Sequence, residues 1–152
     1  MKNTSKFKSI LLIISLLLIT NCSSNNTMKP QDFLDTKPEI TIEEYFKGNV
    51  KAWGLLQDRK GKVTRQFKAD MFGSFEDNVL TLKEDFYWTD GEQQQRIWKI
   101  KKIDNHHYEG SAPDVVGVAK GFQYGSAFKF EYDLMVPFKG RDIKVSFDDW
   151  IF

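Results

Sequence analysis

The sequence has almost no cysteine, since Cys22 is the only one among 152 residues. One thiol cannot close a disulfide within the chain, so the fold must be held by its hydrophobic core even in an oxidising compartment. Histidine is nearly as scarce, and His106 and His107 are adjacent. Adjacent strand residues point to opposite faces, so these two are not expected to bind one metal ion together. No metal and no cofactor is expected.

An excess of charge of one sign is also missing. The chain has 22 Lys and Arg against 21 Asp and Glu, and the two signs are interspersed. Proteins that bind nucleic acid usually carry a concentrated basic patch. Nucleic acid is therefore not expected as a partner.

No apolar run is long enough for a permanent transmembrane helix. The longest one, Ile10–Thr20, is far shorter than the roughly 20 residues that a spanning helix needs. Lys2, Lys6 and Lys8 precede it without any acidic residue. A basic start followed by a short apolar run predicts a signal peptide over residues 1–21.

The residues around Cys22 resemble the lipobox of bacterial lipoproteins. They read Leu18-Ile19-Thr20-Asn21-Cys22, although Asn21 stands where that class usually has Gly, Ala or Ser. The resemblance implies acyl chains such as palmitate on Cys22, which would hold the protein to a membrane. A free cysteine just after an ordinary cleavage site is the alternative. Ser23, rather than Asp, resembles lipoproteins sorted to the periplasmic face of the outer membrane.

The mature chain is expected to form one domain behind a tether. Removal of residues 1–21 takes away three lysines and leaves 19 Lys and Arg against 21 Asp and Glu. Residues 22–40 are mostly polar and predict a flexible lipidated tether. Residues 41–152 form the predicted domain, in which Thr41 and Glu44 resemble a capping box for a short helix that could plug one end of a barrel.

Apolar and polar residues alternate with a period of two through most of residues 49–151, which indicates half-buried strands. Short turn signals separate them, so neighbouring strands should run antiparallel. Strands are predicted over residues 49–58, 63–73, 79–88, 93–102, 106–111, 115–120, 126–137 and 142–151. The predicted fold is an all-β up-and-down meander that closes into a lipocalin-like barrel. A two-sheet sandwich is the alternative, and an outer-membrane barrel is disfavoured because one face is highly charged.

Several sequence blocks resemble a bacterial lipoprotein family catalogued only as a domain of unknown function, DUF3833. The blocks are Gln57–Val63, Glu84-Asp85-Phe86, Asp90-Gly91, Arg96-Ile97-Trp98, Tyr108-Glu109-Gly110, Asp114–Gly117 and Phe147-Asp148-Asp149-Trp150. The resemblance implies a lipocalin-like β fold and a lipoprotein precursor, and it brings no activity. Members of that family continue for about two more strands, so we expect that the chain is truncated at Phe152 or that its barrel is open.

Three charged residues, Glu84, Arg96 and Asp149, lie an even number of positions from apolar residues of their strands. Their side chains should therefore point to the same face of the sheet as those apolar residues, and we say that they share their parity. If those faces point inward, two acids and one arginine enter the barrel. A buried charge is costly unless it is paired, so we predict that Arg96 pairs with Glu84 or Asp149. The pair is either structural or faces the polar head of a ligand.

Aromatic residues are abundant, with 13 Phe, 5 Tyr and 4 Trp. Most should belong to the core, whereas Trp53, Trp88 and Trp98 are predicted to line a ligand cavity. The serines have no matched base, so an enzyme is not expected. The predicted function is a non-enzymatic carrier of an apolar or amphipathic ligand. The alternative is a structural or assembly lipoprotein that contacts an envelope protein.

Overall fold

The computed structural model describes residues 27–138 and 140–152. The predicted signal peptide and Cys22 lie outside the described residues. The elements follow in the order η1 (Pro30–Phe33, a 3-10 turn), α2 (Ile42–Tyr45), β1 (Gly48–Gln57), β2 (Val63–Glu76), β3 (Val79–Trp88), β4 (Gln93–Lys102), β5 (His107–Ser111), β6 (Ala119–Tyr124), β7 (Ala127–Phe138) and β8 (Arg141–Ile151).

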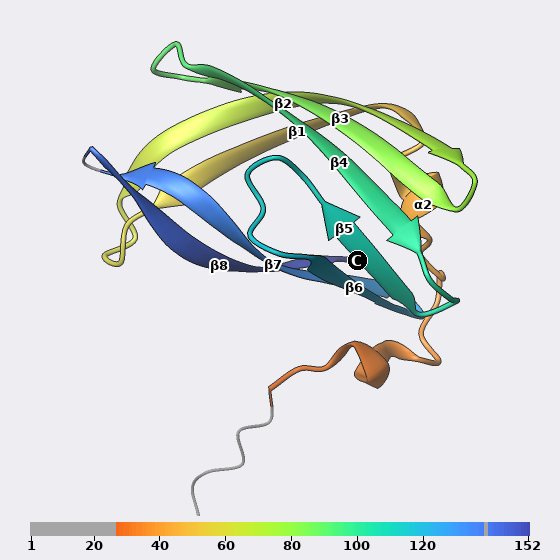
Figure 1. Cartoon of the computed structure of the whole chain (residues 1–152). Coiled ribbons are helices and arrows are strands. Elements are labelled where there is room, and N and C mark those ends of the chain that lie inside the picture. Colours follow the sequence, from red (N-terminus) through yellow and green to blue (C-terminus); the bar gives the residue numbers. More distant parts are fainter. Residues whose placement is uncertain (1–26, 139) are drawn as a thin grey trace, which may run out of the picture.

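All eight strands belong to one antiparallel sheet in the order β1 to β8, with each strand beside the next in sequence. The sheet curls into a half-barrel, and its first and last strands do not pair with each other (Figure 1). Strand twist produces such curling when one face of a sheet is buried. The predicted all-β meander is confirmed in the form of an open lipocalin-like barrel.

Seven strands lie within a few residues of their predicted bounds, and the sixth does not. The strand predicted over residues 115–120 is displaced, because β6 covers 119–124. Val115 forms only an isolated bridge with Leu134, and Gly117 then adopts a positive φ of 76°. That left-handed conformation favours glycine and interrupts the strand. Residues 112–118 therefore form a loop that lies along β7.

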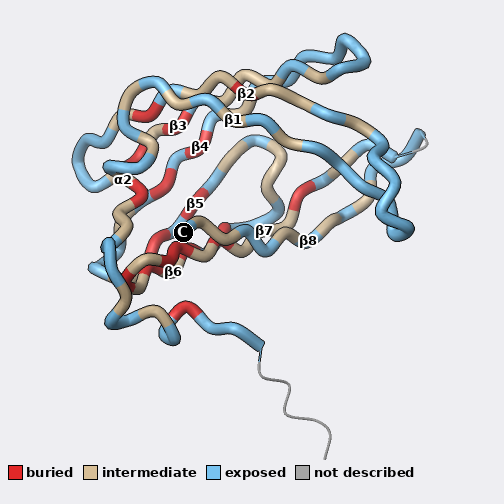
Figure 2. The backbone as a smooth tube through the Cα atoms, turned by 180° about the vertical axis from the view of Figure 1, so that it is seen from behind, coloured by how far each residue is buried: buried red, intermediate tan, exposed pale blue. Residues whose placement is uncertain are grey.

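The core occupies the concave face of the sheet. Its buried residues come from β3 to β7 and from α2, and Figure 2 shows them gathered toward the α2 end of the half-barrel. They are Ile42, Leu80, Leu82, Trp98, Ile100, Tyr108, Ala119, Phe128 and Phe130. The core lies on one face because successive side chains of a strand point to opposite faces. In β4, for example, Trp98 and Ile100 are buried whereas their neighbours are not.

The short helix α2 closes the densely packed end. Ile42 is fully buried, and its amide donates to Gln123 Oε1 at 3.3 Å. The Tyr108 hydroxyl donates to the same Gln123 oxygen at 3.1 Å and to Glu43 at 3.0 Å. The predicted helical turn is confirmed, but Thr41 makes no side-chain capping bond, so the expected capping box is wrong.

Residues 30–40 lie against the domain, so the tether predicted over residues 22–40 is wrong for this part. The Phe33 ring lies 5.4 Å from that of Phe152, and Thr36 Oγ1 lies 2.8 Å from Ser126 Oγ. The Ile40 amide donates to the Gly125 carbonyl at 2.9 Å. The folded unit thus begins about ten residues earlier than the sequence pattern indicated.

No helix within the described residues is long and apolar enough to cross a membrane.

Candidate ligand-binding cavity

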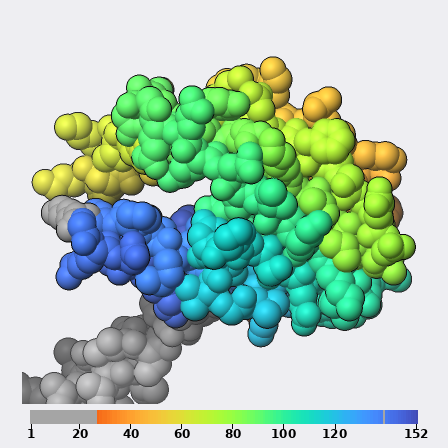
Figure 3. All heavy atoms as spheres, turned by 45° about the horizontal axis from the view of Figure 1, so that its top comes forward, coloured from red at the N-terminus to blue at the C-terminus, as the bar shows by residue number. Residues whose placement is uncertain are grey.

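The curled sheet leaves an internal cavity of about 300 Å³. This lies at the lower end of the roughly 300–1,000 Å³ of small-molecule sites. Figure 3 shows the half-barrel hollowed between the β1–β4 side and the β7–β8 hairpin. The cavity lining comes from α2, its C-cap residue, and strands β2, β3, β4, β7 and β8, and consists of Ile42, Phe46, Phe67, Leu82, Glu84, Phe86, Arg96, Trp98, Ile100, Phe128, Phe130, Tyr132, Phe147, Asp149 and Ile151.

Aromatic rings make up much of the wall. The Trp98 ring lies 5.1 Å from Phe130 and 5.2 Å from Tyr132 in edge-on contacts. Tyr132 also stacks on Phe147 at 5.1 Å. Such contacts fix the rings relative to one another, so this wall has a defined shape.

The charged lining residues are Glu84, Arg96 and Asp149, the three that strand parity placed inward. Glu84 on β3 and Arg96 on β4 are directly opposite each other in the strand register, and Asp149 comes from β8. The Arg96 Nη1 atom lies 3.9 Å from Glu84 Oε2. The predicted Arg96–Glu84 pair is therefore present, at the long end of ion-pair distances.

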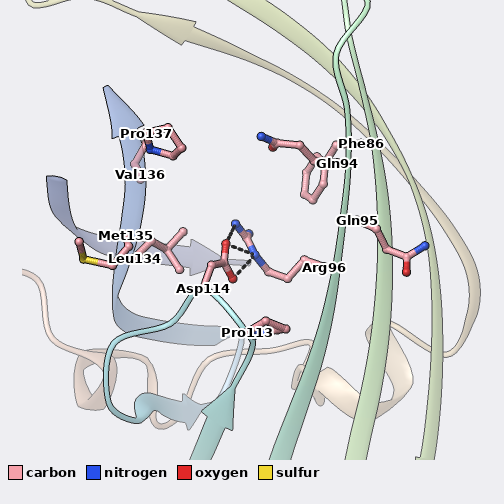
Figure 4. A pocket seen from close by; sticks show the side chains of 10 residues that line it. All are labelled: Phe86, Gln94, Gln95, Arg96, Pro113, Asp114, Leu134, Met135, Val136 and Pro137. Atoms are coloured by element: carbon pink, nitrogen blue, oxygen red, sulfur yellow. Dashed lines mark hydrogen bonds and ion pairs between the residues drawn. The ribbon is translucent and has the colours of Figure 1, made fainter. Parts of the chain in front are cut away.

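The main partner of Arg96 is Asp114, which the sequence reasoning did not select. Arg96 Nε donates to both Asp114 carboxylate oxygens at 3.1 Å, and Nη2 donates to Oδ2 at 2.7 Å (Figure 4). Asp114 is held by its backbone, because its carbonyl accepts a bond from the Met135 amide of β7 at 3.1 Å. One signal was available, since Asp114 begins one of the sequence blocks that carry the family resemblance.

Glu84 is the most perturbed group of the cavity. Its pKa is raised from 4.5 to about 7, mainly by burial, and the Asp114 and Asp149 charges contribute to the rise. Arg96 and a hydrogen bond from the Trp98 indole oppose this shift. The Oε2 atom is buried and has no hydrogen-bond partner among the described residues. At neutral pH this carboxyl can therefore either donate or accept a hydrogen bond toward a ligand.

Asp149 accepts a hydrogen bond at the edge of the cavity. The Tyr132 hydroxyl donates to Asp149 Oδ2 at 2.6 Å. Burial raises the pKa of Tyr132 well above its ordinary value, and the Asp149 carboxylate adds to the effect. Tyr132 consequently stays protonated and acts as a fixed donor.

A second hollow of about 410 Å³ adjoins the first at the Arg96–Asp114 pair. Figure 4 shows Phe86 and Gln94 on one side, and β7 residues from Leu134 to Pro137 on the other. Phe86 and Arg96 line both hollows. The ion pair thus stands at the border between the inner cavity and this outer pocket.

The three predicted cavity tryptophans have different positions. Trp98 lines the cavity. Trp88 packs on Phe67 at 5.0 Å and beneath the Arg65 guanidinium at 4.0 Å, and it is not part of the lining. The prediction for Trp53 is wrong, since its side chain lies on the outer face of β1 and is 73% exposed.

An open, all-β half-barrel with an aromatic cavity and a charged inner end defines this protein as a lipocalin-like β protein. The chain belongs to the family described as Protein of unknown function (DUF3833), whose model matches residues 16–152. No curated protein and no solved structure matches the chain.

Proposed function

We propose that this protein is a lipid-anchored lipoprotein of the cell envelope that binds or carries an amphipathic small molecule without transforming it. In this proposal residues 1–21 are a signal peptide, and Cys22 carries the acyl chains. The domain then faces the periplasm from the outer membrane. The sequence order around Cys22 and Ser23 supports the anchor and the location.

The single observation that carries the binding proposal is the division of the cavity into apolar and polar parts. Most of its wall is aromatic or aliphatic, whereas Glu84, Arg96 and Asp149 supply the polar part. The buried Glu84 Oε2 has no hydrogen bond from any residue that the structure describes, and a buried polar atom in that state is costly. A ligand with an apolar tail and a polar head would complement both parts.

Native mass spectrometry of the full chain extracted from membranes tests the proposal. We expect the acylated chain together with a second, ligand-bound mass. The variant Leu82→Trp places a large ring in the cavity and should remove the ligand-bound mass. The matched control Tyr87→Trp adds the same ring on the exposed outer side of β3 and should retain it. A wild-type protein that carries no ligand and takes up no added amphiphile would contradict the proposal.

A second candidate function is an assembly role through a protein partner. Among the described strands, β1 and β8 end the sheet, and such edges can pair with another chain. The outer face of β1 also exposes Trp53 and Leu55, which are 73% and 50% exposed. A photocrosslinker at position 53 should then capture one reproducible envelope protein, and its absence in repeated captures would count against this role.

A further inference from the structure

We propose that the cavity selects amphiphiles with a cationic head group, such as an amine or a quaternary ammonium, over those with a carboxylate. This inference rests on the proposed binding function and names the class of ligand. It follows from the charges that line the cavity, from the rings beside them, and from the way Arg96 is already paired.

Within the described part of the chain, the lining offers an incoming anion no free positive charge. Its cationic residue is Arg96, whose guanidinium is bound through two nitrogens by Asp114. Glu84 and Asp149 contribute two carboxyl groups to the same lining. A carboxylate head would therefore meet acids and an arginine that is already neutralised, whereas a cation would meet complementary charge.

The buried Glu84 oxygen is the group that a cation would satisfy. Its Oε2 is excluded from solvent, has no hydrogen bond among the described residues, and lies 3.9 Å from the Arg96 nitrogen. An ammonium group donates hydrogen bonds and brings the positive charge that Glu84 receives only weakly from Arg96. A carboxylate head supplies neither, and it can only accept a hydrogen bond from Glu84 when Glu84 is protonated.

Aromatic faces beside Glu84 add a second reason. Trp98, Tyr132 and Phe147 form a continuous wall of rings in contact with one another. The Arg96 guanidinium carbon already lies 5.9 Å from the Trp98 ring, within the range of cation–π attraction. Rings around a carboxylate are a suitable environment for quaternary ammonium groups.

Proton linkage gives this inference a distinctive signature. Glu84 is faced by Arg96 from β4, Asp149 from β8, Tyr132 from β7 and Asp114 from the loop after β5. Its pKa near 7 means that the carboxyl is partly protonated in the empty cavity at neutral pH. A bound cation favours the ionised form, so binding releases a proton and affinity rises between pH 5 and pH 8. For an anion the trend is reversed.

The test uses the full chain in lipid nanodiscs and three probes with one tail: octylammonium, octanoate and octanol. Calorimetry at pH 7 should show the ammonium bound at least tenfold more tightly than octanoate. From pH 5 to pH 8 its affinity should rise about tenfold or more, with proton release visible between buffers of different ionisation enthalpy. Nanodiscs without protein correct for partition of each probe into lipid.

Glu84→Gln should lower the ammonium affinity at least tenfold at pH 8 and remove its pH dependence, while octanol binding changes little. Asp85→Asn makes the same charge change on the neighbouring, outward-facing residue of β3 and should leave ammonium binding unchanged. Octanoate that binds as tightly as the ammonium, or an ammonium affinity unchanged in Glu84→Gln, would overturn the inference while the binding function stands. If none of the three probes binds, both proposals fail.

Discussion

Glu84→Gln should stabilise the protein at alkaline pH and have little effect at acid pH. The carboxyl has a pKa of 4.5 when exposed and about 7 in the folded chain, because burial disfavours its ionised form. At a pH between these two pKa values, Glu84 is therefore protonated in the folded state and ionised in the unfolded state. Stability of the wild-type chain must then fall as pH rises through this window.

The expected magnitude follows from the width of the window. One pKa unit corresponds to about 1.4 kcal/mol of stability. The rise of the Glu84 pKa from 4.5 to about 7 therefore lowers the free energy of unfolding of the wild type by about 3 kcal/mol above pH 7. Glutamine has the shape of the protonated acid and cannot ionise. Glu84→Gln should accordingly match the wild type near pH 4 and exceed its free energy of unfolding by about 3 kcal/mol at pH 8.

Urea unfolding of residues 27–152, followed by tryptophan fluorescence between pH 4 and pH 8, measures this difference. Asp85→Asn is the control of opposite sign, because Lys83 and Gln95 each donate to Asp85 at 2.7 Å and its pKa is lowered. That variant should lose stability at neutral pH and not gain it. The argument that Glu84 is buried in the cavity would be refuted if Glu84→Gln gave no gain in the free energy of unfolding, or the same gain at every pH.

Three further predictions concern the same architecture. Arg96→Met should lower the free energy of unfolding in urea by roughly 1–3 kcal/mol, because Asp114 loses its partner in a partly exposed site. This decrease in stability should be larger at pH 8 than at pH 6. Gly73→Ala should destabilise by about 3 kcal/mol and lower the melting temperature, because its Cβ would collide with the Phe46 carbonyl, and an unchanged melt would contradict this packing. Cys22→Ala should abolish incorporation of labelled palmitate and release the protein from membranes, and continued membrane retention without label would argue against the anchor.

The sequence alone indicated most of the sheet because the period of two is a local property. Along β3 and β4 each residue's parity fixes its face, so the inward direction of Glu84, Arg96 and Trp98 could be read without knowing the strand partners. The prediction that Trp53 lines the cavity did not rest on parity, and it was wrong. There the inward positions of β1 hold small residues, and the Phe67 ring of β2 fills the space that a side chain at Gly54 would take.

What only the tertiary structure decided depends on contacts between distant parts of the chain. Asp114 reaches Arg96 because the loop after β5 is fastened along β7, and no local pattern reports that contact. The docking of Phe33 on Phe152 and the opening between β1 and β8 are likewise set by packing and by the curvature of the whole sheet. Local alternation therefore determined which side chains point inward, whereas long-range packing determined which of them meet and leave a cavity.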